Sequence, residues 1–246
     1  MNAFFNTINS LADKVILPPL EDWIVSRIDY AFDIETPYVR EYINFFKRSN
    51  IPINFRNFKD YNTSIYLTSK HCRINFYDKI FELKDKHDLT DSDIQAELGY
   101  LPPGILRLEI QCENKKIQKI KKKYNLPNSS IALLWNETIA SDIISHYVKA
   151  IVGKENSYSL KDTIKKLQFI YNTGRTFGLA SRLITTLTRN KLANLADMKQ
   201  LVQNKDNFNQ LIFKIRSASV NPIVLDAICD APVALNVLIN PYNLIQ

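Results

Sequence analysis

The first part of the chain alternates apolar and polar residues in short runs, whereas apolar residues beyond Lys115 recur at helical spacing. The alternation predicts strands in "WIVSRIDYAFDI", "NTSIYLTSK", "HCRINFYDK" and "GILRLEIQCE", which turns or proline-rich segments separate. We therefore predict an α+β fold, with a mostly antiparallel sheet backed by helices and followed by a helical C-terminal region. The change of period places a domain boundary near Leu126, which separates an α+β core at 1–126 from a helical domain at 127–246.

Four segments are predicted to be helical. "LADKVILPPLEDW" begins as a short helix that Pro18 and Pro19 end, and "TPYVREYINFFKRSN" follows the first strand with Thr36 as N-cap and Pro37 at the first helical position. "NKKIQKIKKKYNL" can bury its isoleucines while its lysines stay solvated. The segment from "SLKDTIKKLQFIYNTG" onward is a helical run in which Gly174 separates two helices.

Successive strand residues point to opposite faces of a sheet, so residue parity predicts one polar and one apolar face for three of the strands. The polar sets are Arg27, Asp29, Ala31 and Asp33 in the first strand; Arg73, Asn75, Tyr77 and Lys79 in "RINFYDK"; and Arg107, Glu109, Gln111 and Glu113 in "ILRLEIQCE". If the three strands share one sheet with their apolar sides against helices, these side chains gather on one face.

Such a face combines carboxylates, cations and a phenol. Carboxylates are the ligands that Mg²⁺ and Mn²⁺ prefer, and a metal beside arginines can neutralise a phosphodiester during in-line displacement. A tyrosine there can be the nucleophile that forms a phosphotyrosyl bond. The alternative is a solvated sheet face with cross-strand ion pairs and no chemistry.

Composition favours a polyanionic partner. The 246 residues carry 32 Lys+Arg against 25 Asp+Glu, a formal charge of +7, which favours nucleic acid or an anionic surface. Three widely spaced cysteines form no zinc or disulfide pattern, and no apolar run approaches the about 20 residues of a membrane span. With 5 glycines the chain has no glycine-rich phosphate loop. We predict a cytoplasmic protein without a membrane partner.

The segments "SRIDYAFDI", "SIYLTSKHCRINFYDKIFE" and "LRLEIQCENKKI", in this order, resemble phage and plasmid rolling-circle replication proteins of the filamentous-phage gene II/X type. "YINFFKRSNIP" and, more loosely, "ASVNPIVL" extend the resemblance over most of the chain. A more distant likeness runs to plasmid initiators and conjugative relaxases with an "R-x-D", "R-x-Y-x-K", "R-x-E" series.

The resemblance implies a role for individual residues. Tyr77 corresponds to the nicking tyrosine, and Asp29, Asp33 and Glu109 correspond to metal ligands for Mg²⁺ or Mn²⁺. Two departures accompany it. The relatives carry a strand-rich segment upstream of the "RID" block where this chain has a short, mostly helical stretch, so we expect a truncated form. The chain also lacks a His-hydrophobe-His metal motif, so any metal site is expected to be carboxylate-based.

The function predicted from these residues is initiation of rolling-circle DNA replication, in which Tyr77 nicks an origin and leaves a 3′-hydroxyl for the host replication machinery. Lys79 and Arg73 assist catalysis by binding phosphate. The expected DNA-binding residues are Arg27, Arg107, Lys115, Lys116, Lys119 and Lys122. A truncated origin-binding protein without catalysis, or a conjugative relaxase, is the alternative.

Other candidates have competing interpretations. The lysines of "KKIQKIKKKY" are either phosphate contacts or a solubilising helix face. Arg175, Arg182 and Arg189 belong either to a helix-turn-helix or to a bundle in which Phe169, Ile170, Leu179 and Leu183 pack. His71 is expected at a hairpin turn, and Glu82 is either a base or ligand, or a solvated residue.

Overall fold

The computed structural model describes residues 22–49, 57–152, 160–189 and 205–223, together with Pro19, Phe55, Leu195 and Lys199, and of residues 57–60 the backbone alone. The predicted helix at 11–17 lies outside these residues. The described part is an α+β fold, as the change of period predicts.

Five antiparallel strands form one sheet in the order β1-β5-β4-β3-β2. They are β1 (Arg27–Glu35), β2 (Asn57–Tyr61), β3 (Ser64–Thr68), β4 (Cys72–Asp78) and β5 (Ile105–Glu113). Strands β3 and β4 form the predicted hairpin around Lys70 and His71. The last strand, β5, lies between β1 and β4, so the three strands with polar faces are direct neighbours.

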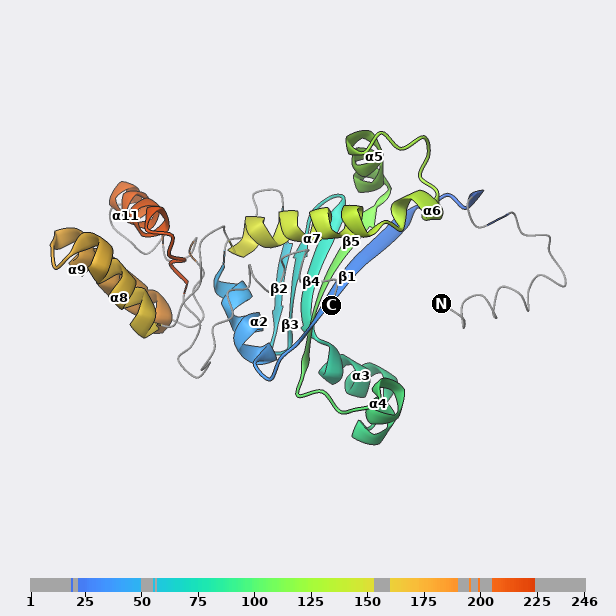
Figure 1. Ribbon diagram of the computed structural model, residues 1–246, viewed down its shortest axis with the longest axis horizontal. Helices are drawn as coiled ribbons and strands as arrows, with labels where there is room; N and C mark the ends of the chain where they lie inside the picture. The colour runs from blue at the N-terminus through green and yellow to red at the C-terminus, as the bar shows by residue number, and fades with distance from the viewer. Residues whose placement is uncertain are drawn as a thin grey trace.

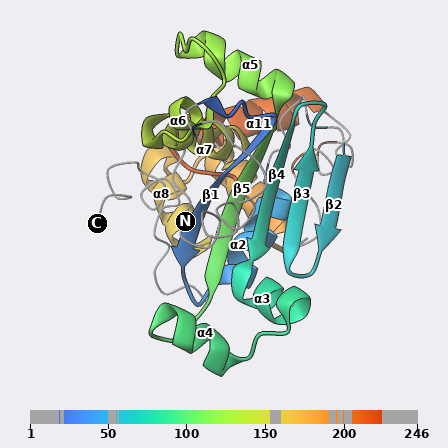
Figure 2. The same cartoon turned by 90° about the vertical axis from the view of Figure 1, so that its right-hand side faces the viewer.

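Two helices cover the apolar face of the sheet. They are α2 (Val39–Arg48), which contacts β3, β4 and β5, and α7 (Glu137–Val152), which contacts β1 and β5. Figure 2 looks onto the opposite face, where the strands lie in front and these helices behind. The polar face is therefore uncovered by described helices.

Shorter helices frame the two ends of the strands. At one end lie α3 (Lys79–His87) and α4 (Asp91–Leu98), and at the other α5 (Asn114–Lys123), which continues directly from β5 (Figures 1 and 2). The four-residue α6 (Ile131–Leu134) leads into α7. The buried pair Ile117 and Ile120 holds α5 against the core, as its spacing predicts, while Tyr124 packs at the core's edge.

Helix α2 begins later than its sequence predicts. Its N-cap is Tyr38, and Thr36 instead accepts a hydrogen bond from the Tyr38 amide at 3.2 Å. Thr36 is held elsewhere through its own amide, which donates to the carbonyl of Gly104 at 3.0 Å. The prediction of Thr36 as N-cap and Pro37 as first helical residue was therefore wrong by two residues, because β1 runs to Glu35 and the hydrogen bond to Gly104 holds Thr36 directly after it.

The sheet core continues beyond the predicted boundary at Leu126. Four residues of α7, Ile139, Ile143, Ile144 and Val148, belong to the same buried cluster as Ile74 and Ile110 of the sheet. The alternation of apolar and polar residues stops near Glu113 because the last strand ends there. Helix α7, which covers β1 and β5, comes later in the chain.

Three further helices form a smaller bundle with its own core (Figure 1). They are α8 (Leu160–Tyr171), α9 (Arg175–Arg189) and α11 (Lys205–Ser217), with the turn at Gly174 where the sequence predicts it. Its buried residues include Leu167, Ala180, Ile184 and Ile215. The expectation that Phe169 packs in a bundle was wrong, because its side chain is 90% exposed. It follows the buried Leu167 by two residues, which places it on the other side of α8.

Candidate functional site: the polar face of the sheet

The polar face predicted from parity is present. In β1 the exposed residues are Arg27, Asp29, Ala31, Asp33 and Glu35, while Tyr30 and Ile34 are buried on the other side. The register places Glu109 between Ala31 of β1 and Asn75 of β4. Two residues along β5, on the same face, Arg107 lies between Asp33 of β1 and Tyr77 of β4. The three strands thus bring the predicted residues together.

Tyr77 lies at the middle of this arrangement. Its hydroxyl donates to Oε2 of Glu109 at 3.1 Å, and the side chain is only 8% exposed although it is on the uncovered face. Burial, and then the charge of Glu109, raise the pKa of the Tyr77 phenol well above its ordinary value of about 10, so the phenol is protonated at neutral pH. A nucleophilic Tyr77 therefore needs a proton acceptor, and Glu109 already accepts its hydrogen bond.

Glu109 is held by three donors. Besides Tyr77, the amide groups of Asn75 and Gln111 donate to its Oε1 at 3.2 and 2.6 Å. These bonds fix the carboxylate between two strands with one oxygen toward the phenol. Sequence parity placed Asn75 and Gln111 on this face but gave no reason to assign them a role, because their contacts depend on the pairing of β4 with β5.

Two arginines of the polar face, Arg107 beside Tyr77 and Arg27 near the other end of the strands, are already paired with carboxylates. Arg107 forms a bidentate interaction with Asp33, and Arg27 binds Asp29 through Nε at 2.9 Å and through a second guanidinium nitrogen. The carboxylate of Asp33 is the main cause that raises the pKa of Arg107. Arg73 is different: it is exposed, and no ion pair with it is found in the described ranges.

Lys79 does not lie on the strand, which corrects the prediction. Strand β4 ends at Asp78, whose carboxylate accepts from the Phe81 amide at 3.0 Å and caps α3. Lys79 is therefore the first residue of the helix, and its ammonium binds Glu82 at 2.7 Å. The capping residue ends the alternation one position earlier than the sequence pattern indicates.

A divalent cation requires several oxygen ligands. In the part of the chain that the structure describes, no group of three or more His, Cys, Asp or Glu side chains is gathered closely enough to hold one. One observation nevertheless fits a cation at Glu109: the amide oxygen of Asn75, whose nitrogen binds Glu109, is buried without a hydrogen-bond partner among the described residues. Asp29 is opposite Gln111 and Asp33 is opposite Arg107, the residues of β5 that lie two positions to either side of Glu109.

The predicted DNA-binding lysines of α5 fall into two groups. Lys115, Lys119 and Lys122 are exposed and recur at a spacing that puts them on one side of the helix. The Nζ atom of Lys116 instead lies 4.7 Å from the ring centroid of Tyr147 on α7, toward the covered side of the sheet. His71 is in the β3–β4 turn as predicted, and Arg175, Arg182 and Arg189 are on α9 of the bundle.

The structure also reveals a hollow that the sequence did not predict. It has a volume of about 540 Å³ and lies beside Tyr77 over β3 and β4, next to α3. Its lining includes Tyr61, Tyr66, Arg73, Phe81 and Glu82. The parity of "NTSIYLTSK" combined with hairpin pairing would have placed Tyr66 here, but Phe81 is brought in by the cap of α3.

Comparisons with protein-family models, with curated proteins and with solved structures each found no match for this chain. None of the described helices is long and apolar enough to cross a bilayer.

Proposed function

We propose that the polar face of the sheet binds DNA and that Tyr77 cuts one strand, as an initiator of rolling-circle replication would. The observation that carries the proposal is the hydrogen bond from the Tyr77 hydroxyl to Glu109, on an uncovered face of a chain with a formal charge of +7. It joins a nucleophile to a proton acceptor within the distance that general-base catalysis requires. The order of the "RID", "RINFYDK" and "RLE" blocks is consistent with it.

In the proposed reaction, the Tyr77 oxygen attacks a phosphodiester and its proton passes to Glu109. The bond from phosphorus to the 3′ oxygen breaks, and that oxygen takes up a proton and leaves as a 3′-hydroxyl. The 5′ phosphate remains bonded to Tyr77, which conserves the energy of the broken bond for rejoining. Among the described arginines of this face, Arg73 is the one without an ion pair, so it is available to a phosphate oxygen.

A divalent cation, Mg²⁺ or Mn²⁺, belongs to this proposal. Glu109 and the amide oxygen of Asn75 would hold it, together with the carboxylate of Asp29 or Asp33 once that carboxylate leaves its arginine. When bound, the ion would neutralise charge on the phosphodiester. The chain's own contribution is to hold the Tyr77 hydroxyl against Glu109 and to exclude water from it.

The test is to incubate the full chain with supercoiled DNA of the replicon that encodes it, with and without Mn²⁺, and to look for a nicked circle with protein at the 5′ end. We expect metal-dependent covalent nicking by the wild type. Tyr77→Phe should remove the covalent product and keep DNA affinity within about twofold, because it deletes one hydroxyl. Tyr66→Phe is the matched control, since it removes another phenol from the same face. Normal nicking by Tyr77→Phe would exclude Tyr77 as nucleophile.

A second candidate, an origin-binding protein that does not cut, is favoured by one observation: Arg27 and Arg107 already neutralise the carboxylates that would otherwise bind metal. The two functions differ in metal dependence. For a binder, Asp29→Asn should leave DNA affinity unchanged or slightly raise it, because a negative charge near phosphate is lost. For the enzyme, Glu109→Gln should reduce nicking by about 100-fold or more, since a general base contributes that much.

A further inference from the structure

The hollow beside Tyr77 has the size and lining of a site for a planar aromatic group. Its volume of about 540 Å³ is within the range of small-molecule sites. Strands β3 and β4 contribute one side, and Tyr61 at the end of β2 and the first turns of α3 contribute the rest. A nucleobase needs only part of this space, so the sugar and phosphate attached to it also fit.

Aromatic rings line this hollow from four elements: Tyr61 of β2, Tyr66 of β3, Tyr77 of β4 and Phe81 of α3. Tyr61 is 51% exposed and Phe81 46% exposed, and the ring of Tyr66 meets that of Tyr61 edge to face, with centroids 5.7 Å apart. Tyr61 and Phe81 therefore present ring surface to solvent. Rings placed along a strand-binding face are the usual means of holding unpaired bases, because every base has a face on which a ring can stack.

Charged side chains of both signs line the hollow: Arg73 and Lys86 are the cations, and Asp78, Glu82 and Asp85 are the carboxylates. Arg73 lines it and, unlike Arg27 and Arg107, has no ion pair within the described ranges. The carboxylate of Glu82 also lines it, but both of its oxygens are engaged, by Lys79 at 2.7 Å and by Lys86 at 3.2 Å. Asp78 and Asp85 lie at the end of β4 and in α3, whereas Arg73 lies near the start of β4, so a phosphate at Arg73 enters the hollow away from these carboxylates.

We propose that this hollow is a base-binding subsite for single-stranded DNA, in which Phe81 and Tyr61 stack on one unpaired base while Arg73 binds an adjacent phosphate. The proposal rests on the proposed function for the identity of the strand, and it goes further by defining the substrate beside Tyr77 as unpaired. A base within a duplex is stacked on its neighbours and cannot enter a side hollow unless it is extruded.

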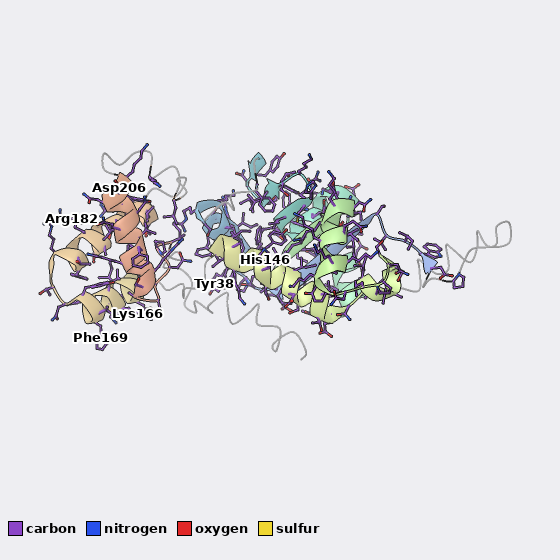
Figure 3. All side chains as sticks on the ribbon, turned by 90° about the horizontal axis from the view of Figure 1, so that it is seen from above. Tyr38, His146, Lys166, Phe169, Arg182 and Asp206 are labelled. Carbon is purple, nitrogen blue, oxygen red and sulfur yellow. The ribbon has the colours of Figure 1, made fainter. Side chains whose placement is uncertain are left out.

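The test measures binding of a labelled oligothymidine of about 12 nucleotides, a length that covers typical single-strand sites. All proteins carry Tyr77→Phe so that cleavage cannot consume the probe. Phe81→Leu and Tyr61→Leu should each weaken binding by about tenfold, as loss of one base-stacking ring does. Phe81→Tyr should retain the affinity, because it keeps a ring. The matched control is Phe169→Leu, which alters an exposed phenylalanine on α8, away from the sheet (Figure 3).

A second set of probes locates the base itself. Each carries one abasic nucleotide, at successive positions. At the position that occupies the hollow, loss of the base should weaken binding to the parent protein about tenfold more than it weakens binding to Phe81→Leu, because that variant has already lost the contact between the base and Phe81. Affinity for a duplex of the same length should not respond to Phe81→Leu.

The outcomes separate this inference from the proposed function. If no abasic position couples to Phe81→Leu, or if the Phe169→Leu control weakens binding as much as Phe81→Leu does, the subsite is excluded, even when wild-type protein nicks its origin. If one position couples while no covalent product forms with wild-type protein, the subsite stands and the nicking reaction is excluded.

Discussion

At the scale of single residues, the polar face depends on which donor reaches which carboxylate. Tyr77, Asn75 and Gln111 all donate to Glu109, while Arg107 is taken by Asp33. Of the three carboxylates predicted to bind metal, Asp29, Asp33 and Glu109, it is therefore Glu109 whose described partners are neutral groups. A neutral donor can leave or transfer its proton without breaking an ion pair, which makes Glu109 the proton acceptor in the proposed reaction.

The raised pKa of Tyr77 predicts how stability changes at high pH. Its folded-state pKa lies above the unfolded value of about 10, so its contribution is complete below pH 10 and is lost as pH rises further, because only the unfolded chain then releases the proton. Tyr77→Phe should cost about 1 kcal/mol at pH 7, where a hydrogen bond is lost. Above pH 10, its unfolding free energy should fall less steeply than that of the wild type, by up to about 1.4 kcal/mol per pH unit.

Chemical denaturation between pH 7 and pH 11 measures this difference. Tyr30→Phe is a positive control, since Tyr30 is buried, donates to the Leu134 carbonyl at 3.0 Å and also has a raised pKa. Parallel curves for wild type and Tyr77→Phe across pH 10 would contradict the protonated, buried phenol.

At the scale of elements, the ends of strands and helices decide which side chains reach the site. Asp78 ends β4 and caps α3, which turns Lys79 into an ion pair and brings Phe81 to the hollow. At the same end of the sheet, β5 begins beside the start of α2 through the hydrogen bond from Thr36 to Gly104. These junctions were the parts of the secondary structure that the sequence pattern placed incorrectly by one or two residues.

The junction at Gly104 predicts a sharp difference between two glycines. A Cβ at residue 104 would lie 2.7 Å from the Thr36 carbonyl oxygen and 2.9 Å from a methyl carbon of Val39, so Gly104→Ala should destabilise the chain by about 1–3 kcal/mol. A Cβ at residue 178, in α9, meets nothing within 4 Å. Gly178→Ala should therefore stabilise by about 0.5–1 kcal/mol.

Urea denaturation of the two variants beside wild type tests this pair. Equal effects of the two alanines would show that β5 and α2 do not approach as described. The contrast also controls for the general gain from replacing a glycine, since both variants restrict the unfolded chain alike.

At the scale of the whole molecule, one apolar face of the sheet needs two covering helices that are far apart in sequence. Helix α2 lies between β1 and β2, but α7 follows the last strand, and its isoleucines are in the same core as Ile74 and Ile110. The bundle is linked to the end of α7 by the side chain of Asn221, which donates to the Val152 carbonyl at 2.6 Å. Folding of the sheet and of the segment after residue 126 is therefore coupled.

This coupling predicts the behaviour of two fragments. Residues 1–126 lack α7 and leave the apolar side of β1 and β5 in water, so this fragment should be unfolded or aggregate. Residues 1–152 keep both covering helices and should fold. Amide proton dispersion in NMR spectra and cooperative thermal unfolding distinguish the two cases. If the 1–126 fragment folded cooperatively, this result would support the domain boundary predicted at Leu126.

The sequence by itself determined four of the five described strands, the polar and apolar faces of three of them, and the gathering of Asp29, Asp33, Tyr77, Arg107 and Glu109 on one side; β2 was not predicted. Parity suffices for this, because a strand has a fixed period of two and one face must be buried. Only the tertiary structure decided that Glu109 binds Tyr77 while the aspartates bind arginines, because partner choice depends on strand order and register. The tertiary structure also forms the hollow at Phe81, because α3 must lie beside β2 and β3.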